Sequence, residues 1–163
     1  MMGDYPLANS WYGRAAVKIA SSRAGAWYLT RLAHHLDRFL LKVSHGRVHS
    51  LGFMPVLHLT TIGARSGQPR TTPLVYVQIE DQIGLIASNG GNPKQPGWYY
   101  NLRANPEARL LFRGQEGVYL AHEAQGRERD KWWREAVSLY PGYATYQKRT
   151  ARQIPVMVLT PKR

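Results

Sequence analysis

The stretch "LTTIGARSGQPRTTPLVYV", from Leu59 to Val77, places two apolar, β-branched runs on either side of a polar loop. The runs extend outward as "PVLHLTTI" (55–62) and "TTPLVYVQI" (71–79), and this composition predicts a strand for each. The loop between them, Thr60–Arg70, contains two glycines, a serine and two arginines. A simple chain reversal does not need so many small and positively charged residues, so the loop is a candidate binding element.

The same strand pattern continues to the end of the chain. Short apolar runs predict four further strands, at 83–88, 108–112, 117–124 and 154–160. Hairpins are expected across Glu80–Gln82 and Arg113–Glu116, and helices over 98–105, stopped before Pro106, and over about 127–139. No strand–helix–strand series indicates a parallel sheet. We therefore expect a mainly β, α+β fold of about six antiparallel strands curled into a barrel.

Residues 1–50 differ from this pattern and are predicted to form a basic, amphipathic helical extension, with the barrel domain over 51–163. A leucine-rich stripe with helical spacing runs through 11–43, opposite a basic face, and 44–52 reads as a glycine-containing linker. Such a helix can lie on an anionic membrane surface, or pack across the barrel or between subunits. Both alternatives stay open.

Composition narrows the class of protein. The chain has 163 residues, 44% of them hydrophobic, which suits one globular domain with an extension. It has no cysteine, which excludes disulfides and thiolate metal sites. No apolar run approaches the ~20 residues that span a bilayer, and the N-terminus lacks a secretory pattern. We expect a cytoplasmic protein, with membrane association through 11–43 as the alternative.

A net charge of +12 would attract a polyanion, either nucleic acid, anionic lipid or a small phosphate-bearing ligand. The basic residues do not fall in a recognised nucleic-acid module, so no nucleic-acid partner is expected. The six histidines have no carboxylates at ligand spacing, and no metal site is expected.

Two loops carry the chemistry of an anion site. In the first, Gly63 and Gly67 can adopt positive φ and let amides converge, while Ser66, Arg65 and Arg70 add donors and charge. In the second, over 89–97, the pair Gly90 and Gly91 and then Lys94 precede a helix that begins with aromatic residues. The alternative for each loop is a solvated connection, and for the aromatic residues it is core packing.

Tyr140, Tyr143 and Tyr146 recur every three residues in "YPGYATY". One helical turn could present all three phenols to a single cavity. Packing of three amphipathic rings at the surface is the structural alternative.

Several motifs stand in order along the chain: "TTIGARSGQPR" (60–70), "ASNGG" (87–91), "PGWYYNLRANP" (96–106) and "YPGYATY" (140–146), before a final "IPV". Together they resemble the deazaflavin-dependent (coenzyme F420-dependent) nitroreductase family of actinobacteria. The similarity covers about residues 54–160. The resemblance implies a split β-barrel, like that of FMN-binding flavoproteins, and a deazaflavin held without a covalent bond.

The resemblance also implies which residues form the site. The loop over 63–71 would bind the cofactor's phosphate and acidic tail, and the second loop and the helix after it would meet the ring. The implied cofactor-binding residues are Ala64, Arg65, Ser66, Gly67, Gln68, Arg70, Thr71, Pro73, Ala87, Ser88, Asn89, Gly97, Trp98, Tyr99 and Asn101. The implied catalytic residues are Ser88, as a hydrogen-bond donor, and Tyr140, Tyr143 and Tyr146, over the substrate.

Hydride transfer from reduced coenzyme F420 to an apolar acceptor, such as a quinone, an enone or a nitro compound, is the implied activity. This chemistry needs positioning and water exclusion and demands no catalytic base. A deazaflavin-binding or storage module without turnover is one alternative, and a split barrel that uses FMN or heme is another. The resemblance further implies a homodimer as one state of assembly.

Overall fold

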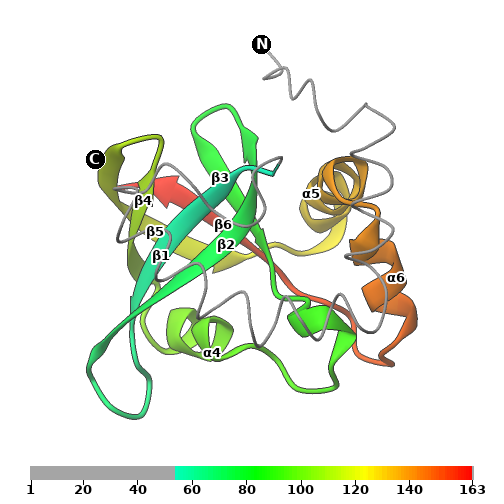
Figure 1. The fold of residues 1–163 in the computed structure, drawn as a ribbon, viewed down its shortest axis with the longest axis horizontal. Coiled ribbons are helices and arrows are strands. Elements are labelled where there is room, and N and C mark those ends of the chain that lie inside the picture. The colour runs from blue at the N-terminus through cyan, green and yellow to red at the C-terminus, as the bar shows by residue number, and fades with distance from the viewer. Residues whose placement is uncertain (1–53, 163) are drawn as a thin grey trace.

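The structure, a computed structural model, describes residues 54–162. The helix predicted over 11–43 and the linker over 44–52 lie outside the described residues. Within them the chain forms one closed antiparallel barrel with strand order β1-β2-β3-β6-β5-β4 (Figure 1). The strands are β1 (Val56–Ile62), β2 (Pro69–Ile79), β3 (Gln82–Ile86), β4 (Glu107–Phe112), β5 (Gln115–Glu123) and β6 (Val156–Pro161). The expected six-stranded antiparallel barrel is confirmed.

A short 3-10 turn and three helices complete the described part of the chain. They are η1 (Asn89–Gly91), α4 (Gly97–Ala104), α5 (Gly126–Leu139) and α6 (Gly142–Lys148). Within the described residues no helix is long and apolar enough to cross a membrane.

The barrel interior is filled by residues that alternate along the strands. Leu57 and Leu59 of β1 and Leu110 of β4 are fully buried there, while their neighbours in sequence point outward. Helix α4 adds Trp98, Tyr99 and Leu102 to the same core. This inner core therefore joins α4 to the strands.

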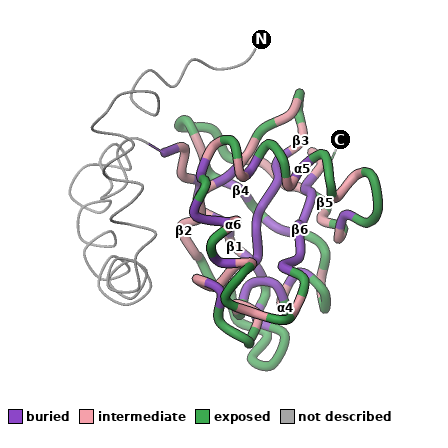
Figure 2. Tube along the Cα trace, turned by 90° about the vertical axis from the view of Figure 1, so that its right-hand side faces the viewer, coloured by how far each residue is buried: buried purple, intermediate pink, exposed green. Residues whose placement is uncertain are grey.

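A second core lies on the outside of the barrel, where α5 covers β2, β3 and β6 and α6 packs against α5 and η1 (Figure 1). Trp132 and Ala136 of α5 are buried in this outer core together with Val156 and Val158 of β6. The first four residues of β6 are buried without alternation, as the continuous purple tube of β6 shows (Figure 2). The unbroken apolar run in the sequence is thus explained by a strand covered on both faces.

The first loop is shorter than predicted. Its expected bounds, Thr60–Arg70, are wrong, because Thr60 pairs with Thr71 and Thr61 with Arg70 in the β1–β2 ladder. The hydroxyls of Thr60 and Thr71 lie 2.9 Å apart across that ladder, which favours continued pairing. Only Gly63–Gln68 remain outside the strands.

Gly84 of β3 is where α5 comes closest to the sheet. A Cβ added there would lie 2.5 Å from Cε3 of Trp132. Glycine is therefore required so that the indole can lie directly on the strand.

Gly84→Ala should destabilise the protein by about 1–3 kcal/mol, because the added methyl overpacks the outer core. Urea unfolding followed by far-UV circular dichroism measures this. The matched control is Gly97→Ala at the start of α4, where nothing lies within 4 Å of the added carbon; that change should be neutral or stabilise by up to about 1 kcal/mol. Equal stability of wild type and Gly84→Ala would show that α5 can move off the strand.

Candidate functional site

The residues implied by the motifs lie mainly at one end of the barrel. The β1–β2 loop, helix α4 and the β3–α4 connection that contains η1 are found along its lower edge, and α6 borders η1 (Figure 1). Segments distant in sequence therefore come together, as the ordered motifs predicted.

The β1–β2 loop is closed by its own backbone. The Gly63 amide donates to the Gln68 carbonyl at 2.9 Å, and the Gly67 amide donates to the Gly63 carbonyl at 2.8 Å. The Gln68 amide donates to Oγ of Ser66 at 3.3 Å. Gly67 has the positive φ that was expected, 64°. The same expectation for Gly63 is wrong; a Cβ there would lie 2.6 Å from Oγ of Ser66 and 3.2 Å from the Gln68 carbonyl, so a side chain would require Ser66 to move.

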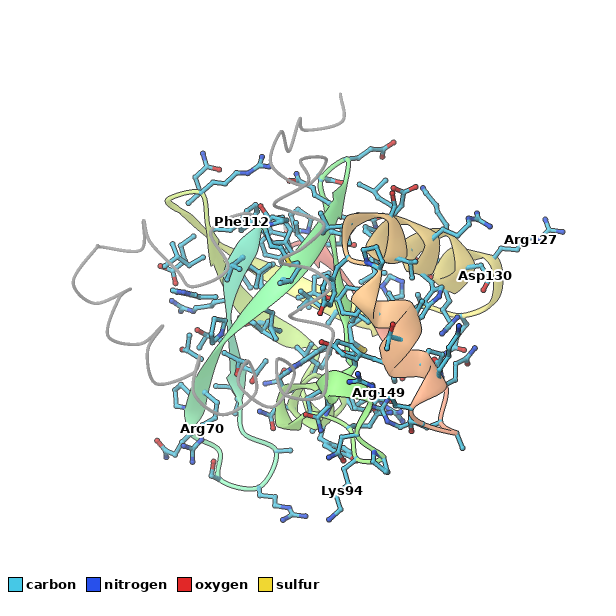
Figure 3. All side chains as sticks on the ribbon, turned by 45° about the vertical axis from the view of Figure 1, so that its right-hand side comes forward. Arg70, Lys94, Phe112, Arg127, Asp130 and Arg149 are labelled. Carbon is cyan, nitrogen blue, oxygen red and sulfur yellow. The ribbon has the colours of Figure 1, made fainter. Side chains whose placement is uncertain are left out.

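These hydrogen bonds differ from the predicted anion nest, in which the loop amides would converge on a ligand. Several amides of the loop are already engaged within the protein, so they do not converge on a ligand. The guanidinium groups of Arg65 and Arg70, in contrast, belong to exposed residues, and Figure 3 shows Arg70 pointing away from the barrel. An anion at this loop would be held mainly by these two cations.

Asn101 ties the loop to α4. Its Oδ1 accepts the amide of Ala64 at 3.0 Å, and its Nδ2 donates to Oγ1 of Thr61 at 3.0 Å. Thr61 is only 1% exposed, so this contact also satisfies a buried hydroxyl. The sequence did not predict Thr61 as a site residue. Cofactor contact by Asn101 stays a prediction, beside this structural role.

The β3–α4 connection begins with buried Ala87 and half-buried Ser88. Three successive residues then have left-handed φ angles: Asn89 (47°), Gly90 (65°) and Gly91 (82°). The side chain of Asn89 donates to the Lys94 carbonyl at 2.9 Å, which closes the loop on itself. The glycines predicted from the sequence are needed for this turn, whereas Asn89 adopts it as a less common non-glycine residue.

Arg152, which precedes β6, donates hydrogen bonds to three backbone carbonyls of this connection. Its Nε donates to the Asn92 carbonyl at 3.0 Å. Its Nη2 lies 3.2 Å from the Ala87 carbonyl and 2.9 Å from the Ser88 carbonyl. Burial lowers the pKa of the guanidinium from its ordinary value. Sequence reasoning missed Arg152, because its partners are 60–65 residues away and no local pattern marks it.

The aromatic run at the start of α4 divides between core and surface. Trp98 and Tyr99 are each 6% exposed in the inner core, whereas Tyr100 is 52% exposed. The Tyr99 hydroxyl donates to Glu123 at 2.8 Å and accepts from Arg103 at 3.0 Å. Core packing of two rings, the alternative left open by the sequence, is therefore present. Contact of Trp98 and Tyr99 with a cofactor stays a prediction.

The three tyrosines come together as their spacing predicted. Tyr140 follows α5, and Tyr143 and Tyr146 belong to α6. Their ring centroids lie 5.2–6.4 Å apart, and the hydroxyls of Tyr140 and Tyr146 are 2.9 Å apart. All three are buried in the outer core, at 5–6% exposure, so packing on the surface is excluded. Their place over a substrate stays a prediction.

Within residues 54–162 no group of histidine, aspartate and glutamate side chains could hold a metal ion. His58 and His122 lie in β1 and β5, where the sequence placed them. His122 Nε2 lies 2.9 Å from Glu128 Oε1, which links β5 to α5.

Comparison with known proteins agrees with this arrangement. Residues 33–161 match the profile of a family described as F420H(2)-dependent quinone reductase. An F420H(2)-dependent quinone reductase of Mycobacterium tuberculosis is 39% identical over 122 residues, which cover 72% of this chain and 82% of the relative. The match begins before the quoted motifs, at residue 33.

Solved structures give the same result. An F420-H2-dependent reductase is 42% identical and superposes with a TM-score of 0.61, over 64% of this chain and 93% of that one. A structure described as a domain-swapped dimer is 39% identical, with a TM-score of 0.63 over 77% and 93% of the two chains.

The buried tyrosines make stability depend on pH. Burial raises the pKa of the Tyr143 phenol above its ordinary value, so the folded protein keeps a proton that the unfolded chain releases. The associated stability is complete below about pH 10 and is lost as the pH rises further. Tyr143→Phe should therefore flatten the fall in unfolding free energy above about pH 10. Urea titrations at stepped pH measure it, with exposed Tyr100→Phe as the control. Identical slopes for all three proteins would contradict the expectation.

Proposed function

The chain belongs to the F420H(2)-dependent quinone reductase family, and on that premise we propose that it transfers a hydride from reduced coenzyme F420 to a quinone. The single observation that carries the proposal is the match over residues 33–161. This match includes both loops and the three tyrosines. Enones and nitro compounds are further acceptors that we propose for the same site, because they also accept hydride at carbon or at a polarised group.

The residues present fit a deazaflavin with an anionic tail. Exposed Arg65 and Arg70 supply two cations beside a loop whose shape is held by its own hydrogen bonds. At the start of α4, Gly97 has open space where a side chain would stand, and Tyr100 offers an exposed aromatic face. A flat ring needs such room and such a surface.

Reduced deazaflavin, when bound, supplies the hydride. The chain's own task is to bind the ring, hold the acceptor close to it and exclude water. We assign cofactor binding to the residues of the two loops and α4 that the resemblance names. The Ser88 hydroxyl, on a half-buried residue at the end of β3, would donate a hydrogen bond to the ring or acceptor.

The tyrosines supply an apolar, protonated surface in this proposal. A tyrosine phenol is protonated at neutral pH, and burial raises the pKa values of Tyr140 and Tyr143 further, so neither phenol can serve as a base and both can donate hydrogen bonds. Val75 of β2 packs against the same outer core. A quinone lying near this cluster would find aromatic contacts and a hydroxyl pair.

Two copies of the chain are a proposed state of assembly, supported by the similar structure described as a domain-swapped dimer. The division into an extension (1–50) and a barrel domain (51–163) stays a prediction. So does membrane contact through 11–43, whose residues lie outside the described part of the chain.

The first test is turnover. Purified protein should bind coenzyme F420 more tightly than FMN, and the reduced cofactor should be oxidised only when a quinone such as menadione is added. Stopped-flow absorbance measures both.

In the same assay Tyr140→Phe should lower turnover at least about tenfold if its hydroxyl serves as the donor, because general-acid help is commonly worth 10²–10⁴-fold. Cofactor affinity should stay unchanged in this variant.

Other results would separate the alternatives. Binding without oxidation, with every acceptor class, would favour a storage module. Tighter binding of FMN than of coenzyme F420 would favour a flavin enzyme. Full turnover in the phenylalanine variant would leave Tyr140 with a packing role only.

Arg65→Ala and Arg70→Ala should each weaken coenzyme F420 binding about tenfold or more, because a charge-assisted hydrogen bond is worth about 1.5–3 kcal/mol. Wild-type affinity should also fall as salt rises. The matched control is Arg127→Ala on α5, an exposed arginine whose side chain points away from Arg70 (Figure 3). Fluorescence titration measures all three. Unchanged affinity in both loop variants would show that the loop is only a connection.

A further inference from the structure

The guanidinium of Arg152 is surrounded by carbonyls of the β3–α4 connection. Nε reaches Asn92, and Nη2 reaches both Ala87 and Ser88, all within 2.9–3.2 Å. These carbonyls lie on both sides of the left-handed turn at Asn89–Gly91. One side chain thus holds together the two ends of the turn.

The other hydrogen bonds of the turn are local, and they include those of Asn89 Nδ2 to the Lys94 carbonyl and of the Lys94 amide to Asn92 Oδ1, each at 2.9 Å. Gly91 donates to the Ser88 carbonyl at 2.9 Å and Asn92 to the Asn89 carbonyl at 3.0 Å, which are bonds of one short 3-10 turn. A left-handed φ is uncommon outside glycine, and although asparagine adopts it more readily than most residues, its surroundings decide whether that conformation is kept. A planar guanidinium with several donors in fixed directions can impose it, whereas a single flexible donor cannot.

Arg152 also lowers the stability of the folded protein at this position. Its Nη1 is buried and has no hydrogen-bond partner within the described residues. Oε1 of Gln95, in the β3–α4 connection, is likewise buried without a partner there. Arg152 as a whole is half-buried, but a donor atom that is shielded from water without a partner lowers stability compared with an apolar group in its place. A role in packing alone would not require it. Its donors are directed instead at Ser88 and Ala87, which lie in the segment implied to meet the cofactor ring.

We propose that Arg152 is a positioning residue, which sets the backbone of Ala87–Asn92 in the conformation that receives the deazaflavin ring and presents the Ser88 hydroxyl. The proposal rests on the proposed function for the identity of the ring. It does not place Arg152 in contact with cofactor or substrate. Its effect passes through the carbonyls that it holds.

Arg152→Gln and Arg152→Lys test the role in the full-length protein. Arg152→Gln should raise KM for the reduced cofactor about tenfold or more, because charged hydrogen bonds to three carbonyls are lost. KM for menadione should change less than about twofold, because the proposal assigns the backbone of 87–92 to contact with the cofactor and not with the acceptor. Arg152→Lys keeps the charge but loses the planar set of guanidinium donors, so its effect on KM should be intermediate.

Arg129→Gln is the matched control. Arg129 is likewise an arginine with a buried, unpartnered Nε, and its Nη2 donates to a backbone carbonyl, that of Ile154, at 3.1 Å. It lies on α5 and does not hold the β3–α4 connection. The control variant should leave KM for the cofactor unchanged. Equal increases in Arg129→Gln and Arg152→Gln would show general destabilisation and overturn the proposal.

Amide hydrogen exchange in the cofactor-free protein provides a readout that does not depend on catalysis. Exchange at Gly91 and Asn92 should be faster in Arg152→Gln than in wild type and unchanged in Arg129→Gln. Wild-type rates at both amides, or an unchanged KM for the cofactor, would overturn the inference while the proposed function stands. A wild type that binds no coenzyme F420 would instead refute the proposed function, and the exchange rates would still decide whether Arg152 holds the turn.

Discussion

The structure depends on β6 being apolar on both of its faces. β6 pairs with β3 on one side and with β5 on the other, and so joins β1–β2–β3 to the β4–β5 hairpin, while the β1–β4 pairing closes the barrel. Met157 and Leu159 enter the inner core, and Val156 and Val158 enter the outer core. A polar residue at any of these positions would have to be buried without a strand neighbour to satisfy it. Both cores therefore rely on one continuous hydrophobic run.

The candidate site takes its geometry from the beginning of the same strand. The Pro155 carbonyl accepts the Ala87 amide at 3.0 Å, and Arg152, three residues earlier in the chain, holds the carbonyls of the same connection. The proposed ring-binding segment is thus fixed to the residues that lead into β6, the strand between β3 and β5. This arrangement suits hydride transfer, in which catalysis comes mostly from holding two flat molecules at the correct distance.

Charge and apolar surface are separated across the site. Arg65 and Arg70 stand exposed in and beside a loop that its own backbone keeps closed, whereas the tyrosines, at the end of α5 and on α6, lie in the outer core. Cations that remain in water bind an anion without a large desolvation cost. Buried phenols with raised pKa values provide a surface that stays neutral and protonated. The two halves of the proposed reaction, cofactor capture and acceptor contact, use these different environments.

The sequence by itself determined the strands, the antiparallel class, the family and the residue types at the site. Apolar alternation and turn residues are local properties, and ordered motifs such as "TTIGARSGQPR" identify relatives without coordinates. Only the tertiary structure decided that Pro69 and Arg70 belong to β2, that a Cβ at Gly63 would meet the Ser66 side chain, and that the tyrosines are buried. It also revealed the contacts of Asn101 with Thr61 and of Arg152 with Ala87, Ser88 and Asn92. These contacts join residues 40–65 positions apart, and such pairings follow from how the barrel closes, which no local pattern in the chain encodes.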